Sequence, residues 1–531
     1  MNRLTRIITH VLLFRKYGPH LLAAGFGVGA IYPLIELLWV QVHYPGELEW
    51  MEGQALGHVV RVLEGLPLYS EPSVEFTAYI YPPMHAWVGA LVSLVLGASL
   101  KTLHLISAIA TCGSMLVIVD WVRRRHNDWL SGLAGAGIFA ATFHLSGAWF
   151  ATARVDSLFV FFVLLAGHLL LNFRGTPSAI VGAFVLAGAV LTKQSGMSSL
   201  CLLAMLAACS CTKRGVLAAV LSVLTIVVSV AVLHWSTSGW FWYYTVELPR
   251  SHEILSDWIK DFWVIDVWTL LAAPAIMSLF AGLATLSQRP EGSPPIHQAG
   301  FKAAFGQVYR ADLLIMLLSL LLPAWAARFH SGMYENVLMP MHAALALGTA
   351  EALAHTRTLG RDPRPGSAQS GFHMSLVWSG AVIFSLLGLQ ENYISQTPDA
   401  RRSQAFSQAV DELKQLPPNT WVVTNQGLGH SAGLPIRSHA MALFDIFRAN
   451  QETDLTKQLV ADVRKSLREK RFGAVVIPGK NGVTGWFWRD LERGYKLEKS
   501  IEGPNMTTGW DVHLVEIWRP RAGPTHREGS Q

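Results

Sequence analysis

The segment Glu47–His85, ELEWMEGQALGHVVRVLEGLPLYSEPSVEFTAYIYPPMH, lies between two long apolar runs and holds six carboxylates against one cation, Arg61. Its part from Glu52 to Glu64 carries apolar residues at helical spacing, which predicts an amphipathic helix. Gly65 and Pro67 follow and end this helix. A charged segment of this kind indicates a loop with one helix at the surface of a membrane.

Two of its carboxylates, Glu49 and Glu52, stand three residues apart, so they share a face if the first helical turn includes both. They also stand at the helix N-terminus, where the helix dipole favours negative charge. Two carboxylates held together at a membrane surface suit a catalytic base, a site for a divalent metal such as Mg²⁺ or Mn²⁺, or both. The alternative is an acidic interfacial loop without chemistry, and this stretch alone leaves the two interpretations open.

The composition is that of a polytopic membrane protein. Of the 531 residues, 51% are apolar and 15% are charged, and the mean hydropathy is +0.33, whereas soluble domains carry about 25% charged residues. Twelve apolar segments follow one another between Leu21 and Leu389, many of them close to the roughly 20 residues that cross a bilayer. The net charge of +6 therefore reflects topology, and nucleic acid is not an expected partner. The four cysteines lie in apolar runs or at their ends, which predicts neither a disulfide framework nor a zinc site.

The distribution of cations predicts about eleven crossings, with the N-terminus inside and the C-terminus outside. Simple alternation would place Arg123–Arg125 on the same side as the acidic loop 43–83, so the segment Pro83–Val119 is expected to cross once, with one part short, tilted or interfacial. The inner segments then hold 16 cations against six carboxylates, while the outer loops 43–83 and 235–266 are rich in carboxylates. The first apolar run, Leu21–Val42, is too long for a signal peptide and is expected to be an uncleaved span.

The chain turns polar after residue 390, which predicts a second domain. Residues 1–390 are expected to form the membrane module and residues 391–518 a small α/β domain outside the membrane, because predicted helices and strands alternate there. The predicted elements are a helix at Asp399–Leu416, a strand at Trp421–Thr424, a helix at Asp454–Lys470, a strand at Ala474–Ile477, a helix at Trp486–Arg493 and a strand at His513–Trp518. The tail, residues 519–531, is expected to be disordered.

Four polar clusters interrupt the apolar runs, and the predicted topology places all of them on the outer side. Ionisable groups at membrane depth indicate function because burying them is costly. In chain order the clusters are Glu49 and Glu52 with Tyr79, Tyr81 and His85; then Arg154-Val-Asp156-Ser157; then Thr192-Lys193-Gln194-Ser195; and last the stretch Arg328–Asn336 with His330 and Tyr334.

Each cluster also has a purely structural explanation. Arg154 and Asp156 could neutralise each other and fix two helices, and Lys193 could extend its ammonium group to the lipid headgroups. The aromatic residues of the loop His234–Trp268 fit an interfacial belt, or the walls of a groove for a sugar or a prenyl chain. Gathered on one face, however, the clusters suit displacement of a phosphate leaving group. A carboxylate then takes the proton of an acceptor hydroxyl, while a cation or divalent ion neutralises the charge on the phosphate.

The order of the short motifs adds a further indication. From the first loop onward they are E-W-M-E-G, G-L-P-L-Y, Y-x-Y-P-P, A-R-x-D, L-T-K-Q-S and H-x-G-x-x-x-N, followed by a soluble tail. This order resembles the GT-C superfamily of polytopic glycosyltransferases, in the bacterial set that includes 4-amino-arabinose lipid A transferases and protein mannosyltransferases. The resemblance covers roughly residues 21–354 and, more loosely, the tail.

The resemblance implies a sugar donor linked to a lipid phosphate, usually a polyprenyl monophosphate, and transfer on the non-cytoplasmic face of the membrane. By position, Glu49 or Glu52 matches the acidic residue of the first loop, and Asp156 matches that of the second outer loop. Many relatives carry an Asp-Glu pair where this chain has Glu49-Trp-Met-Glu52. This departure leaves open which of the two glutamates is the base.

We therefore predict an inverting glycosyltransferase of the bacterial inner membrane that moves a sugar from a polyprenyl-phosphate donor to a periplasmic glycolipid, polysaccharide or protein. The expected residues are Glu49, Glu52 and Asp156 for catalysis, the first two also for a metal; Arg154, Lys193, Gln194 and His330 for the donor phosphate; and Tyr81, His85, Tyr334 and Asn336 for substrate binding. One alternative is a transporter or flippase of a lipid-linked sugar, which should show inverted repeats that are not visible in this chain. Another is an inactive scaffold.

Overall fold

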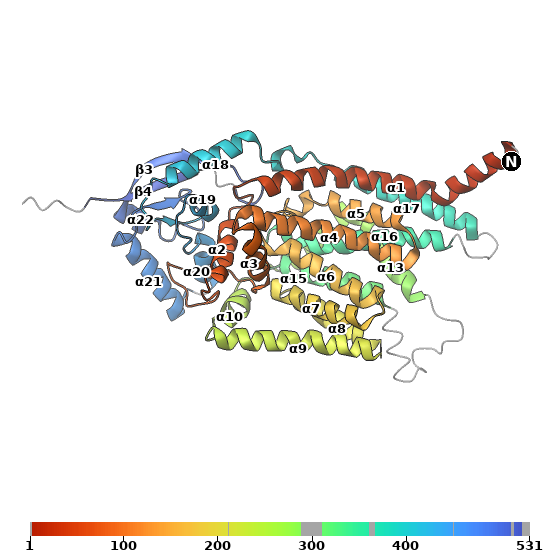
Figure 1. Cartoon of the computed structure of the whole chain (residues 1–531), viewed down its shortest axis with the longest axis horizontal. Coiled ribbons are helices and arrows are strands. Elements are labelled where there is room, and N and C mark those ends of the chain that lie inside the picture. The colour runs from red at the N-terminus through yellow and green to blue at the C-terminus, as the bar shows by residue number, and fades with distance from the viewer. Residues whose placement is uncertain are drawn as a thin grey trace, which may run out of the picture.

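The computed structural model describes residues 3–210, 212–287, 311–359, 367–449, 451–510 and 514–522. A bundle of long helices occupies most of the molecule, and a small α/β domain sits at one end of it (Figure 1). We call the end of the bundle that carries this domain the domain end, and the opposite end the far end. The helices that make up the bundle are α1 (Arg3–His43), α4 (Leu100–His126), α5 (Trp129–Ala141), α6 (Val155–Asn172), α7 (Thr176–Thr192), α8 (Gly196–Cys209), α9 (Lys213–Ser236), α13 (Leu270–Ser287), α15 (Asp312–Arg328), α16 (Met339–Leu359) and α17 (Ser367–Leu389).

These helices confirm the predicted multi-pass membrane protein. In the described part of the chain, seven helical segments are long and apolar enough to cross a membrane, and the shorter apolar helices α5, α7 and α8 pack among them. Together with α15, which packs on α8 and α16, they account for the expected number of about eleven crossings. The apolar run expected at Leu130–Phe150 is helical only as far as Ala141.

The centre of the bundle is packed through small residues. Helix α16 is buried along its whole apolar length. A Cβ atom added to Gly135 of α5 would lie 2.5 Å from the Cβ of Ala350 in α16, and one added to Gly137 would lie 2.3 Å from the Cα of Gly27 in α1. Glycine at these positions therefore lets three helix backbones approach closely, as is usual between membrane helices.

The segment between Pro83 and Val119 has the arrangement expected for a single crossing. Helix α3 (Met84–Leu96) lies across the domain end beside α2 (Glu52–Leu63), whereas α4 runs along the bundle (Figure 1). Gly97, with a φ of 80°, makes the turn between α3 and α4, a conformation that glycine adopts without strain.

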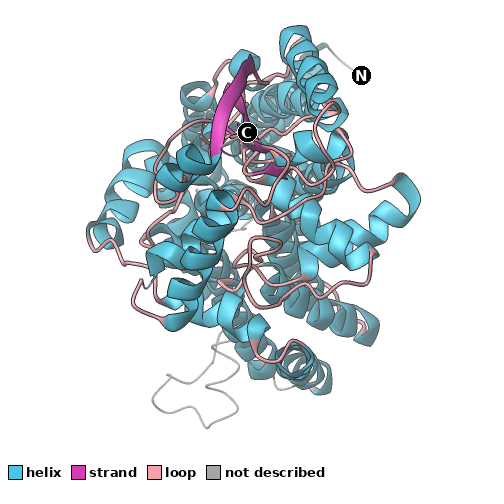
Figure 2. Cartoon of the chain, turned by 90° about the vertical axis from the view of Figure 1, so that its left-hand side faces the viewer, coloured by secondary structure: helices cyan, strands magenta, loops and turns pink. Residues whose placement is uncertain are grey.

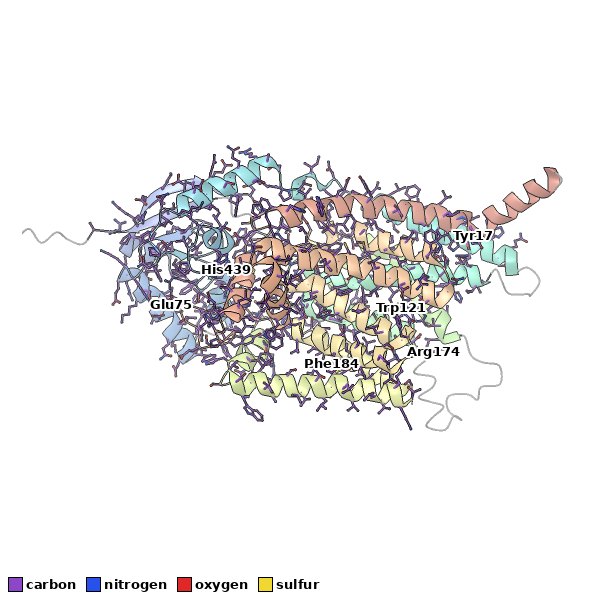
Figure 3. All side chains as sticks on the ribbon, in the orientation of Figure 1. Tyr17, Glu75, Trp121, Arg174, Phe184 and His439 are labelled. Carbon is purple, nitrogen blue, oxygen red and sulfur yellow. The ribbon has the colours of Figure 1, made fainter. Side chains whose placement is uncertain are left out.

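The far end is held by buried charges. Glu351 of α16 accepts hydrogen bonds from Trp121 Nε1 and His126 Nε2 of α4, both at 2.7 Å, and Arg125 pairs with Asp312 of α15 at 2.8 Å. Trp121 and Arg174 both lie at this end (Figure 3). The cations Arg123–Arg125 are therefore at the end opposite the acidic loop, as the topology requires. Five of the cations counted for the inner side lie outside the described residues: Arg289, Lys302, Arg310, Arg361 and Arg364.

Short helical segments connect the bundle helices. They are η1 (His144–Ser146), α10 (Trp240–Trp242), η2 (Tyr243–Glu247), α11 (Leu248–Arg250), α12 (Asp257–Asp261), η3 (Phe262–Thr269), η5 (Glu335–Leu338) and η6 (Tyr393–Gln396). In the aromatic loop His234–Trp268, Phe241 and Tyr244 are buried against Tyr69 of the acidic loop, whereas Trp235 is 79% exposed. The loop therefore combines a packed wall at the domain end with exposed rings typical of an interfacial belt.

The C-terminal domain is built on one four-stranded sheet of order β1-β2-β4-β3, which forms a single small patch among the helices (Figure 2). The pair β1–β2 is parallel, and β4 is antiparallel to both of its neighbours. The strands are β1 (Trp421–Val422), β2 (Val475–Ile477), β3 (Tyr495–Glu502) and β4 (Leu514–Pro520), and the helices are α18 (Ala400–Leu413), α19 (Gln426–Ser431), α20 (Ala440–Ala449), α21 (Asp454–Arg468) and α22 (Trp488–Gly494).

The predicted α/β character of this domain is confirmed, with three additions and one correction. Helices α19 and α20 and strand β3 were not expected. Strand β4 continues to Pro520, so the predicted boundary between the domain and a disordered tail after residue 518 is wrong: Arg519 and Pro520 pair with β3. Residues 523–531 of the expected tail lie outside the described residues.

Candidate active site

The acidic loop lies between the domain end of the bundle and the C-terminal domain. Glu75 of the loop forms ion pairs with Arg437 and with Arg471, the second at 2.7 Å, and His439 Nε2 lies 3.2 Å from the Trp50 carbonyl oxygen. Glu75 and His439 both lie at this end of the molecule (Figure 3). The C-terminal domain therefore covers the loop that the sequence marks as the site.

The centre of the site is an ion pair between Glu49 and Arg154. Arg154 Nη1 donates to Glu49 Oε2 at 2.9 Å, and the two residues are 5% and 1% exposed. The guanidinium carbon of Arg154 lies 5.6–5.7 Å from the ring centroids of Tyr79, Tyr81 and Trp149, within the range of a cation–π contact. Arg154 Nη2 also approaches the Tyr81 hydroxyl at 3.5 Å. Arg154 is thus a buried cation held by one carboxylate and three aromatic rings.

The environment of Glu49 changes its acidity. Burial raises the pKa of Glu49 to about 7, although the neighbouring Arg154 lowers it. A carboxylate with a pKa near neutral can take up and release a proton at physiological pH, as a general base must.

A second buried ion pair is centred on Asp156, in the first turn of α6. Lys193 Nζ, at the C-terminal end of α7, lies 2.6 Å from Asp156 Oδ1. Asn336 Nδ2, in η5, donates to Asp156 Oδ2 at 2.9 Å. The structure therefore brings together residues from the second, third and fourth predicted clusters, and all three are buried.

Three more of the predicted residues line or flank this centre. Tyr81, His85 and Arg154 line a small cavity of about 20 Å³, which is room for about one water molecule. His85 Nε2 is buried and has no hydrogen-bond partner among the described residues. A polar ligand in the cavity could therefore form a hydrogen bond with it. Gln194 Nε2 donates to the Ile80 carbonyl oxygen at 3.1 Å, and its Oε1 is likewise buried without a partner in the described structure.

Tyr334 borders the site and His330 does not. The Tyr334 ring packs 5.1 Å from that of Trp149, which itself faces Arg154. The His330 ring stacks on Phe329, and its backbone pairs with Ile254. Among the described residues, no hydrogen bond or ion pair joins His330 to the two cations of the site, so the predicted phosphate role of His330 has no contact to support it.

Glu52 occupies a different position from Glu49. Helix α2 begins at Glu52, so Glu49 precedes the helix and the two carboxylates do not share its first turn. Glu52 Oε2 accepts hydrogen bonds from Leu48 N at 2.7 Å and from His104 Nε2 at 3.0 Å. Its Oε1 accepts one from Ala153 N at 2.6 Å. Glu52 is fully buried and joins the acidic loop, α4 and the turn before α6.

These contacts do not fit a metal ion shared by Glu49 and Glu52. Both oxygens of Glu52 already accept protein hydrogen bonds, and Glu49 is paired with a guanidinium group. Within the described ranges there is no group of three or more His, Cys, Asp or Glu side chains placed to hold a metal. A divalent ion in proteins takes several oxygen ligands, so we derive no chemical step through one.

Several residues of the site were not predicted. His104 is an ionisable group inside an apolar run, a signal that the sequence does contain. Trp149 lies near the end of the apolar run Leu130–Phe150, where an aromatic residue is typical of the membrane interface, so the sequence offers no signal that marks it for the site. His439 comes from the C-terminal domain, far along the chain, and no local pattern links it to the acidic loop.

One family model matches part of the chain. A family model described as dolichyl-phosphate-mannose-protein mannosyltransferase matches residues 81–236, a region that contains Tyr81, Arg154, Asp156 and Lys193. No curated protein sequence matches the chain.

Solved structures resemble the whole chain. The structure of ArnT from Cupriavidus metallidurans bound to undecaprenyl phosphate has 12% sequence identity and a TM-score of 0.53, over 94% of this chain and 99% of that chain. The oligosaccharyltransferase of Archaeoglobus fulgidus in the apo form has 12% identity and a TM-score of 0.49, over 91% of this chain and 73% of that chain. At such identities the likeness to ArnT shows the fold alone, and it confirms the predicted fold class, a polytopic α-helical protein with a small C-terminal α/β region.

Proposed function

We propose that this GT-C-fold protein is an inverting glycosyltransferase of the bacterial inner membrane, which moves a sugar from a polyprenyl-phosphate carrier to an acceptor outside the cytoplasm. The observation that carries the proposal is the pair of buried ion pairs at the domain end, Glu49 with Arg154 and Asp156 with Lys193. A site with two cations and a carboxylate of near-neutral pKa has the groups that displacement of a lipid phosphate needs.

The reaction breaks the bond between the anomeric carbon of the sugar and the phosphate oxygen of the carrier. An acceptor hydroxyl attacks that carbon from the opposite side, which inverts its configuration, and Glu49 takes the hydroxyl proton. The electron pair of the broken bond stays with the phosphate, whose growing negative charge Arg154 and Lys193 stabilise. Atoms and charge balance without a further reactant.

The ion pairs give donor binding a direct effect on the base. When a phosphate approaches, Arg154 gains a second anionic partner and interacts less with Glu49. Because Arg154 lowers the pKa of Glu49, weakening this contact makes Glu49 a stronger base. Donor binding would thus prepare the carboxylate for the acceptor proton.

The remaining predicted residues take supporting roles in this proposal. Glu52 positions the loop through its three hydrogen bonds instead of acting as the base, and Asn336 orients Asp156. We assign contacts with the sugar to Tyr81 and His85, which line the small cavity beside Arg154, to Tyr334, and to the Gln194 amide oxygen, which has no hydrogen-bond partner among the described residues. His330 is the one predicted phosphate ligand that we place outside the binding site.

The comparisons support this donor class. The family model that matches residues 81–236 is named for transfer from dolichyl-phosphate-mannose, and the ArnT structure holds undecaprenyl phosphate. They give no support to the flippase alternative. The acceptor is a glycolipid, a polysaccharide or a protein.

The orientation follows from charge. The far end carries the arginines of α4, and the domain end carries the acidic loop, so the positive-inside rule places the far end in the cytoplasm. The C-terminal domain and the site are then periplasmic.

The test is a transfer assay in proteoliposomes with radiolabelled undecaprenyl-phosphate sugars, including mannose and 4-amino-arabinose. Glu49→Gln keeps the size of the side chain and removes proton acceptance, so turnover should fall about a hundredfold to ten-thousandfold. Glu71→Gln, in the same loop, is the control, because Glu71 is exposed to solvent. Equal turnover of the two variants would refute Glu49 as the base and leave the likeness as one of fold.

A further inference from the structure

The loop between β3 and β4 is unusually long. Strand β3 ends at Glu502 and β4 begins at Leu514, whereas the loops of β-hairpins usually have about 2–5 residues. The described part Met506–Trp510, which we call the strap, does not extend into solvent: Met506 and Thr507 are buried.

The strap binds the residue before Glu49. Thr507 N and Thr508 N both donate to the Leu48 carbonyl oxygen, at 3.0 and 3.2 Å, and Thr507 Oγ1 reaches the same oxygen at 3.2 Å. The Trp510 ring packs edge-on to Trp50, with ring centroids 5.4 Å apart. The two neighbours of Glu49 in the chain are therefore both held by the strap.

The strap also contacts the membrane bundle. Thr508 Oγ1 donates to the Gly147 carbonyl oxygen and lies 3.4 Å from the Tyr334 hydroxyl. Gly509 N donates to the same hydroxyl at 3.4 Å. Since Tyr334 packs on Trp149, and Trp149 faces Arg154, the strap touches both sides of the Glu49–Arg154 pair.

Gly509 is the residue of the strap that lies against the Glu49 side chain. Its φ of 75° is one that glycine adopts readily, and an added Cβ would lie 2.9 Å from Glu49 Cγ and 3.4 Å from Glu49 Oε1. Glu49 cannot move aside freely, because its carboxylate is bound to Arg154. Any side chain at position 509 would thus displace either the strap or the carboxylate.

We infer that the strap is the element through which the C-terminal domain positions Glu49, so that the membrane site is complete only when this domain is docked. This inference rests on the proposed role of Glu49. Gly509 is a positioning residue: it acts on the acceptor proton only through the carboxylate it contacts.

The test compares Gly509→Ala with Gly433→Ala in the full-length protein. Both glycines belong to the C-terminal domain and have similar positive φ angles, of 75° and 79°, but a Cβ at Gly433 meets no atom within 4 Å. The backbone strain is therefore matched, and the contact with Glu49 is the difference. We expect Gly509→Ala to lower kcat about tenfold to a hundredfold, as a displacement of about 1 Å does at an active centre, with little change in KM for the donor. Gly433→Ala should keep the kcat of the parent protein.

Two further measurements separate positioning from general damage. Hydrogen exchange of the Thr507 and Thr508 amides should accelerate in Gly509→Ala and stay slow in Gly433→Ala, and this readout needs no enzyme activity. The acidic limb of the pH profile of kcat should also move to lower pH in Gly509→Ala, because Glu49 then loses part of its dry surroundings while Arg154 and Glu52 stay beside it.

The outcomes distinguish the role of the strap from the proposed function. If Glu49→Gln abolishes transfer while Gly509→Ala leaves kcat, pH profile and exchange unchanged, the strap does not position Glu49 and the proposed function stands. If Gly509→Ala accelerates hydrogen exchange, but Gly509→Ala and Glu49→Gln both transfer sugar at the rate of the parent protein, the docking contact is real and the proposed function fails.

Discussion

Replacing Glu52 by Gln should destabilise the protein, in contrast to the catalytic loss expected for Glu49. The carboxylate of Glu52 accepts one hydrogen bond on Oε1, from Ala153 N, and two on Oε2, from Leu48 N and His104 Nε2. A glutamine side chain has one oxygen that accepts and an amide group that only donates. In either orientation the amide therefore faces a backbone N–H group, which loses its acceptor in a fully buried place.

The expected cost is about 1–3 kcal/mol for each buried donor left without a partner, a large part of the roughly 5–15 kcal/mol that stabilises a typical protein. The assay is thermal unfolding of detergent-purified protein at one fixed scan rate, because membrane proteins seldom refold after heating and the midpoint then depends on the rate. Glu71→Gln is the control: this carboxylate of the same loop is exposed, and substitutions of exposed residues usually change stability by less than about 0.5 kcal/mol.

A midpoint for Glu52→Gln equal to that of Glu71→Gln, together with a turnover as low as that of Glu49→Gln, would contradict this reasoning. Glu52 would then be the base that the sequence left as an alternative, and Glu49 a partner of Arg154 only.

Two other predictions concern Glu49 and Lys193. The value of kcat/KM should rise between about pH 6 and pH 8, because it reports the enzyme without donor, in which Glu49 accepts a proton only after losing its own and burial raises its pKa to about 7; a kcat/KM that is flat over this range would argue against a carboxylate base. Lys193→Met should weaken binding of the donor lipid about tenfold to a hundredfold, since a charge-assisted hydrogen bond contributes about 1.5–3 kcal/mol. The double variant Lys193→Met/Asp156→Asn removes the carboxylate that the single change leaves unpaired, and recovery of donor affinity in it would assign the loss to Asp156 and not to the phosphate contact.

The membrane bundle could be predicted from the sequence because each of its helices has a local signal, an apolar run with charged residues at one end. The single crossing of the segment Pro83–Val119 followed from the position of Arg123–Arg125, since their cost on the acidic side outweighs simple alternation. Strand β3 was missed because it is an edge strand, YKLEKSIE, with mostly exposed residues. Lysine and glutamate on an edge prevent further pairing, and they also erase the apolar alternation that marks a strand.

The site was predictable as a set of residues and much less as a set of contacts. The predicted topology correctly gathered Glu49, Arg154, Asp156 and Lys193 at one end of the bundle, because all four lie in or beside connections on the same side of the predicted spans. The sequence could not show which residues pair with each other, because Arg154 lies 105 positions from Glu49 and Asn336 lies 180 positions from Asp156. The sequence also left open whether Glu49 and Glu52 share the first turn of the helix: α2 starts at Glu52, so Glu49 precedes the helix and the two side chains take different partners.

The contact between the strap and the acidic loop also sets an order of events during synthesis. Thr507 and Leu48 are joined across 459 positions of sequence, and chains grow at about 5–20 residues per second, so the loop waits roughly 25 to 90 seconds for its partner. During that time the bundle can insert helix by helix with Glu49 not yet fixed. The nascent protein would therefore be inserted in the membrane before it can act on the lipid around it. It would become active only when the β3–β4 hairpin, which carries the strap, has been synthesised.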